Sequence, residues 1–124
     1  MIETPTMKIF IDEDGILHHD CSEGSVHDID SAISNVKLSI DLAKGQKHPV
    51  LVDLKGIKYM SRETRNYYSN EETGKFVGKA ALVVGDPVSK IMGNVFMRLQ
   101  KTVFPTRLFT DREKAIEWLK SNEI

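Results

Sequence analysis

The chain has 124 residues, which suffices for one domain with its own core and leaves no room for a second. Its 17 basic and 18 acidic residues give a net charge of -1, so no overall charge attracts it to nucleic acid or to an anionic membrane. Cys21 is the single cysteine, which excludes an intrachain disulfide and favours a cytoplasmic location, and no apolar run reaches the roughly 18 residues of a membrane span.

The first half of the chain predicts a β-hairpin followed by a helix. Residues 6–12 alternate apolar and polar side chains, as in a half-buried strand, and residues 16–19 form a second strand after a turn. Ser25 is a suitable cap for a long helix, which we expect to end near Gly45. The face of this helix toward the core is predicted to carry Val26, Ile29, Ile33, Val36 and Ile40.

The second half predicts strands separated by helices. Continuous apolar runs at 50–52 and 80–84 favour strands that are covered on both faces. Ser61 opens a helix expected to reach about Glu72, and 85–87 supply a cap and a first-turn proline for an amphipathic helix. An edge strand at 104–109 and a final helix follow.

The element order β-β-α-β-α-β-α-β-α predicts a single α/β domain with a mixed, mostly parallel sheet of about five strands and four helices. The predicted core contains Ile9, Ile11, Ile33, Val36, Leu51, Val52, Leu82, Val83, Ile91, Val95 and Leu119.

Sequence motifs for catalysis are missing, since the chain has no P-loop, no dinucleotide-binding glycine pattern and no nucleophile elbow. Asp53 ends a central strand, where α/β sheets bind ligands. It is either a general base or ligand anchor, or a residue that ends the strand and accepts hydrogen bonds from the loop at Gly56 and Ile57. His19, His27 and Asp28 could hold a metal, but solvated side chains are the simpler interpretation. We therefore expect no metal, no cofactor and no enzyme activity.

Ser61 admits two interpretations. It is a good helix cap, and a helix N-terminus also favours a phosphate. The helix after it has few apolar residues beyond Tyr67 and Tyr68, so it is either a recognition surface or merely exposed. The candidate binding residues are Asp53, Ser61, Arg62 and Arg65.

The element order, the segment VLVDLKGIKYM and the helix after it resemble the STAS domain of sulphate transporters and anti-sigma factor antagonists. The segments AALVVGDPVSKIMGNVF and FPTRLFTDREKAIEWL resemble uncharacterised bacterial STAS-like and SEC14-like small proteins. In the antagonists, a partner kinase phosphorylates a serine in an Asp-Ser-Ser-Gly-like turn. Aligned on Met60, Ser61 takes the place of the aspartate and Arg62 that of the phosphorylated serine, so the motif is not preserved. A shift of one residue would return Ser61 to that position.

These observations predict a non-enzymatic regulatory or protein-interaction module of STAS-like fold. The alternative is a small apolar ligand or lipid-binding protein, and a third hypothesis is an enzyme using Asp53 with Ser61 or a tyrosine. The protein partner is unidentified. Leu38 and Leu42 lie opposite the predicted core face of the first helix, so they are either covered by another segment or form the contact of a possible homodimer.

Overall fold

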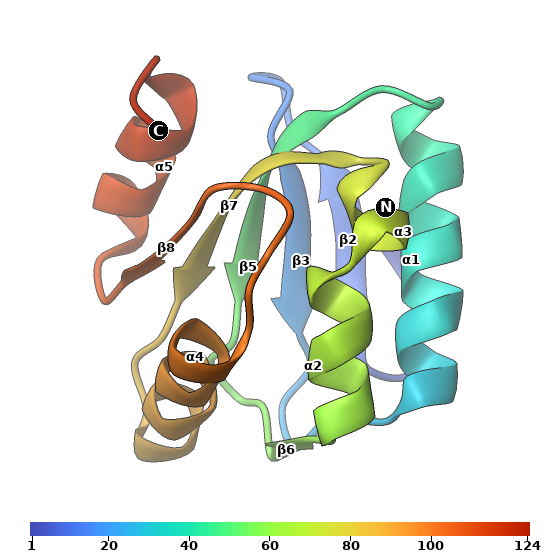
Figure 1. Cartoon of the computed structure of the whole chain (residues 1–124), viewed down its shortest axis with the longest axis vertical. Coiled ribbons are helices and arrows are strands. Elements are labelled where there is room, and N and C mark those ends of the chain that lie inside the picture. Colours follow the sequence, from blue (N-terminus) through green and yellow to red (C-terminus); the bar gives the residue numbers. More distant parts are fainter.

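A mixed six-stranded sheet organises the computed structural model, which describes residues 1–124 (Figure 1). Its strands are β1 (Ile2–Glu3), β2 (Met7–Ile11), β3 (Leu17–Cys21), β5 (His48–Asp53), β7 (Val77–Val83) and β8 (Thr106–Phe109), in the order β1-β2-β3-β5-β7-β8. The first three pair antiparallel, and β3, β5, β7 and β8 pair parallel. The predicted hairpin and the parallel interior of the sheet are therefore confirmed. Outside the main sheet, β4 (Val26–His27) pairs in parallel with β6 (Tyr59–Met60).

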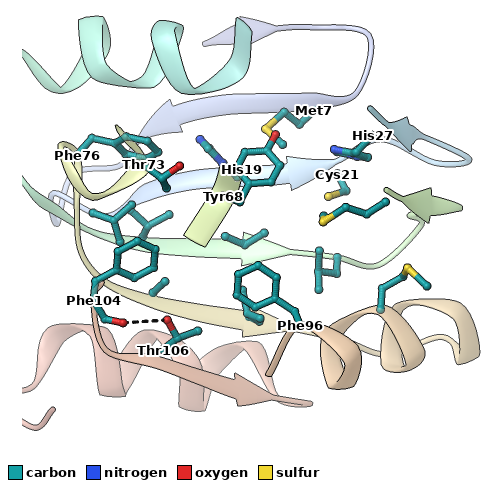
Figure 2. Close-up of a pocket in the computed structure, with 18 residues that line it drawn as sticks. Met7, His19, Cys21, His27, Tyr68, Thr73, Phe76, Phe96, Phe104 and Thr106 are labelled. Carbon is teal, nitrogen blue, oxygen red and sulfur yellow. Dashed lines mark hydrogen bonds between the residues drawn. The ribbon is translucent and has the colours of Figure 1, made fainter. Parts of the chain in front are cut away.

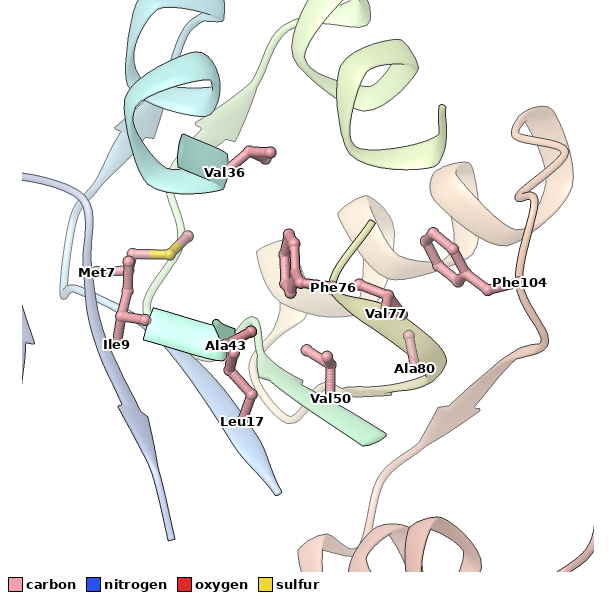
Figure 3. Packing of buried hydrophobic residues seen from close by; sticks show 10 residues of the cluster. All are labelled: Met7, Ile9, Leu17, Val36, Ala43, Val50, Phe76, Val77, Ala80 and Phe104. Carbon is pink, nitrogen blue, oxygen red and sulfur yellow. The ribbon is translucent and has the colours of Figure 1, made fainter. Parts of the chain in front are cut away.

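Five helices cover the two faces of the sheet unequally. They are α1 (Ile29–Ala43), α2 (Arg62–Ser69), α3 (Glu71–Gly74), α4 (Pro87–Leu99) and α5 (Arg112–Lys120). Successive side chains of a strand point to opposite faces. On β5, Val50 therefore joins the cluster that includes α1 residues (Figure 3). Leu51 points to the other face and packs with Trp118 and Leu119 of α5. None of the five helices is both long and apolar enough to cross a bilayer.

The first helix begins later than predicted and buries a different face. Ser25 is not its cap, because Val26 and the next residue form β4, and the cap is Asp28, which accepts from the Ser31 amide in a capping box. Ile33 is 45% exposed, so its predicted place in the core was wrong. Besides the predicted Val36, the face turned inward carries the small residues Ala32 and Ala43 and the polar residues Asn35 and Ser39.

The helix α4 is also rotated relative to the prediction. Ile91 is 57% exposed, and the buried residues of the helix are Ser89, Gly93 and Phe96. The cause is a close contact, since a Cβ built on Gly93 would lie 2.7 Å from Val84 Cγ1. The helix turns Gly93 toward Val84, just after β7, and toward Leu108 of β8, while Val88, Ile91 and Leu99 point outward.

The remaining nine predicted core residues are buried or half-buried. Six are buried: Ile9, Val36, Leu51, Leu82, Val83 and Leu119. Three are half-buried: Ile11, Val52 and Val95. The predicted helix at 61–72 is divided at Asn70, whose side chain accepts from the amides of Glu72 and Thr73 and starts α3.

Candidate functional site

An apolar cavity of about 60 Å³ lies inside the domain, on the face of the sheet opposite α5 (Figure 2). It is lined by 18 residues, of which 14 are hydrophobic, and none of them is exposed. The strands contribute Met7, His19, Cys21, His27, Val50, Val52, Met60, Val77, Ala80, Leu82 and Thr106. Leu54, Tyr68, Thr73, Phe76, Met92, Phe96 and Phe104 complete the wall from helices and connecting segments.

Strand alternation and one small residue explain why space remains at this position. Val50 and Val52 of β5 point to the cavity, as do Ala80 and Leu82 of β7. Ala80 is paired with Val50 in the ladder but supplies only a methyl group where a branched side chain would fill the space.

The α4 side of the cavity is held in place by Asp86. Its carboxylate caps α4 by accepting from the Ser89 amide at 2.7 Å, and it also accepts from the Gly56 amide at 2.9 Å. The bonds from Gly56 and then Ser89 lower the pKa of Asp86, since they stabilise its ionised form. The loop after β5 and the helix that carries Met92 are thereby fixed to each other.

The cavity wall includes histidines that we expected in solvent, so that interpretation was wrong. His19 is 3% exposed, and its Nε2 lies 2.7 Å from Ser39 Oγ. Ser39 donates its one proton to the Asn35 carbonyl oxygen at 2.8 Å, so His19 Nε2 must be the donor in the first contact. His19 Nδ1 therefore carries a lone pair, and the only hydrogen bond of this imidazole is the one from Nε2 to Ser39.

His27 has a similar unpaired nitrogen. The residue is fully buried, its Nε2 lies 2.9 Å from Ser25 Oγ, and its Nδ1 has no hydrogen-bond partner. Burial lowers the pKa of His27 to about 4, while burial, reinforced by the charges of His27 and His18, lowers the pKa of His19 to about 3. Both imidazoles are neutral at physiological pH.

Tyr68 and Cys21 complete the polar part of the wall. The Tyr68 hydroxyl accepts from Asn35 Nδ2 at 3.2 Å, and its own proton has no acceptor in the protein. Burial raises the pKa values of both the Tyr68 hydroxyl and the Cys21 thiol, so both stay protonated. No Asp, Glu, Lys or Arg side chain lines the cavity.

The structure does not bring the four candidate residues of the sequence together. The carboxylate of Asp53 points to the α5 face, where it accepts from Arg112 Nη1 at 2.7 Å and from the Lys55 amide at 3.0 Å. Arg112 also donates to His18 Nδ1 at 3.0 Å, so His18 uses Nε2–H to bind Asp12 at 2.8 Å. Asp53 was predicted to accept from the loop at Gly56 and Ile57, and this was wrong, because the Gly56 amide donates to Asp86 and the Ile57 amide to the Leu54 carbonyl oxygen. The pairing of Asp53 with Arg112, 59 residues away, left no signal in the sequence.

Ser61 caps α2, as predicted, by accepting from the Thr64 amide at 3.2 Å. Arg62 is exposed, and Arg65 is half-buried with Nε unpaired. These three residues belong to the α2 side of the sheet, whereas Asp53 belongs to the α5 side. The four candidate residues therefore do not share one face of the sheet, and the binding role of each stays a prediction.

The leucines of the dimer hypothesis are not an exposed pair. Leu38 and Leu42 are half-buried and pack against the cluster that contains Met7, Ile9 and Val36. The exposure from which the dimer contact was inferred is thus contradicted, because the rotation of α1 carries these leucines toward the sheet.

Comparison with solved structures defines the class of fold. An uncharacterised protein of the DUF3478 family from Shewanella loihica PV-4, described as having a SpoIIAA-like fold, matches 96% of this chain and 98% of its own length. The TM-score is 0.62 and the sequence identity 17%. The chain has a SpoIIAA-like fold, and the STAS-like architecture predicted from the sequence is confirmed.

The chain belongs to the family described as Domain of unknown function (DUF7793), whose profile matches residues 9–123. A protein of unknown function from Arthrobacter sp. FB24 is 21% identical and covers 96% of both chains, with a TM-score of 0.37. No curated protein matches the sequence.

Proposed function

We propose that this STAS-like domain is a non-enzymatic module that binds a small apolar ligand in its internal cavity. The observation that carries the proposal is the buried, mainly hydrophobic cavity of about 60 Å³. Protein interiors are close-packed, and residual cavity volume costs about 24 cal/mol per Å³. An empty cavity of 60 Å³ would therefore cost about 1.4 kcal/mol of folding free energy. A bound ligand would recover this loss.

The chemistry of the wall supports binding without catalysis. Ser39 cannot be activated by His19, because the serine proton is donated to the Asn35 carbonyl oxygen. The contact between Ser25 and His27 lacks a third group on His27 Nδ1 that would orient the base. The thiol of Cys21 is protonated, which makes it a poor nucleophile.

A protein-interaction module is the second candidate, and one surface favours it. The outer face of α4 exposes Val88, Ile91 and Leu99, the last at 67%. Apolar side chains that gather on one helix face are typical of protein contacts. A homodimer and a signalling role in the cytoplasm belong to this candidate, and the contact would then use α4 in place of Leu38 and Leu42. Light scattering on the wild type and on Ile91→Glu tests it, since a monomeric wild type at high micromolar concentration argues against the dimer.

A pair of neighbouring alanines tests the ligand-binding function. Ala80 faces the cavity, whereas Ala81 is fully buried on the α5 face. In Ala80→Val the added methyl groups enter free space, so we expect unchanged or higher stability by up to about 1 kcal/mol. In Ala81→Val they meet a packed layer, which costs about 1–3 kcal/mol.

Ligand binding is measured on the same two variants. Protein-observed NMR with small apolar compounds should show saturable shifts at cavity residues in the wild type. Ala80→Val should lose these shifts, and Ala81→Val should keep them if it remains folded. Equal binding by the wild type and Ala80→Val, or no binding by the wild type, would contradict the proposed function.

A further inference from the structure

Two side chains of the cavity wall have hydrogen-bonding capacity that the protein leaves unused: His19 has a free acceptor and Tyr68 a free donor. Both side chains are hydrogen-bonded to the same face of α1. His19 Nε2 donates to Ser39, and the Tyr68 hydroxyl accepts from Asn35. Asn35 and Ser39 are four residues apart on α1, so they are neighbours on one helix face. The side chains of His19 and Tyr68 therefore lie side by side at one end of the cavity (Figure 2).

We infer that the ligand of the proposed site is an uncharged molecule with an apolar body and a hydroxyl group, which donates to His19 Nδ1 and accepts from Tyr68 O–H. This inference rests on the proposed ligand-binding function. A hydroxyl both donates and accepts, so one group satisfies both polar atoms. The apolar body faces Leu82, Phe96 and Phe104.

The composition of the wall excludes a charged ligand. No cationic or anionic side chain lines the cavity, and both histidines are neutral. A carboxylate, a phosphate or an ammonium group would lose its hydration without gaining an ionic partner, which is strongly unfavourable. The unpaired Nδ1 of His27 adds a second position where a neutral polar group can bond.

The size of the cavity limits the ligand to a few heavy atoms unless the wall adapts. An engineered cavity of roughly 150 Å³ binds benzene, and the present one measures about 60 Å³. Met7, Met60 and Met92 line it, and methionine side chains rearrange readily. A probe with one six-membered ring therefore binds only if these methionine side chains rearrange.

The inference is tested with phenol, toluene and benzoate as probes of isotope-labelled protein. Phenol and toluene have equal numbers of heavy atoms and differ in the hydroxyl, while benzoate adds a charge. We expect phenol to bind about 10-fold or more tightly than toluene, and benzoate not to bind. The nitrogen resonance of His19 Nδ1 should move with phenol and stay in place with toluene.

Two tyrosine variants test whether the hydroxyl group of the ligand binds to Tyr68. Tyr68→Phe removes the free O–H with little change in shape, so the preference for phenol should disappear. Tyr67→Phe is the matched control, because Tyr67 is the adjacent half-buried tyrosine and does not line the cavity, and it should keep the preference.

The outcomes separate this inference from the proposed function. If toluene binds at least as well as phenol, or benzoate binds best, the cavity is a ligand site but the uncharged hydroxyl ligand is wrong. A phenol preference that persists in Tyr68→Phe overturns the assignment to this pair. If none of the probes binds, the proposed function falls as well, and water is the occupant of the polar end.

Discussion

Acidification should remove a large part of the folding free energy because His19 and His27 are buried as neutral imidazoles. Burial lowers their pKa values from 6.5 to about 3 and about 4. The folded state keeps both neutral, whereas the unfolded chain protonates both below pH 6.5. Stability is thus fully present above pH 6.5 and is lost as the pH falls toward the folded pKa values.

The magnitude follows from proton linkage. Each histidine lowers the free energy of unfolding by about 1.4 kcal/mol per pH unit in this range, or roughly 3 kcal/mol for the two. At pH 4.5 the loss is about 5 kcal/mol, which approaches the whole stability of a typical small domain. Asp12, Asp28 and Asp86 have lowered pKa values, so their contributions are lost only below their ordinary value of 3.8, outside this window.

The assay is urea unfolding at pH 7.5, 6.5, 5.5 and 4.5, followed by the fluorescence of Trp118, the single tryptophan. The free energy of unfolding should change little between the first two values and then fall steeply. In His19→Gln, the amide can still donate to Ser39, and the slope should be about halved. A free energy of unfolding that stays constant down to pH 5 would refute the reasoning, because it would mean that the imidazoles are protonated as easily in the folded chain.

Three further predictions concern local structure and are measured by chemical denaturation. Gly93→Ala should destabilise by about 1 kcal/mol, although alanine favours helices, because its Cβ would crowd Val84, and Asn94→Ala on the exposed side should not. Lys79→Met should cost about 1 kcal/mol, since the ammonium donates to three carbonyl oxygens at the end of α5; no loss would mean that these bonds are replaced by water. Ser61→Ala should lose about 1 kcal/mol and Ser61→Asp should not, whereas stoichiometric phosphate on Ser61 in protein from its own cell would support a switch.

The sheet could be predicted from the sequence because its signals are local. The apolar runs that contain Leu51 and Leu82 are strands because buried parallel strands need apolar residues on both faces. The helix rotations could not be predicted, since each depends on a tertiary contact. The inward face of α1 is stabilised by the bonds of Asn35 to Tyr68 and of Ser39 to His19, and these partners lie 33 and 20 residues away.

The cavity left no sequence signal for the same reason. Two of its features, the unfilled volume and the unpaired polar groups, both bear on whether it is a binding site. The unfilled volume corresponds to about 1.4 kcal/mol, and a buried polar atom without a partner, such as His27 Nδ1 in this wall, costs about 1–3 kcal/mol. A larger residue at Ala80 would fill the empty volume, and phenylalanine at position 68 would remove the unused hydroxyl proton. A sequence optimised for stability alone would use such substitutions, whereas a binding site needs both the space and the unpaired groups. That both occur around one cavity, which β3, β7 and α2 help to line, favours a site for an amphipathic small molecule over a packing defect.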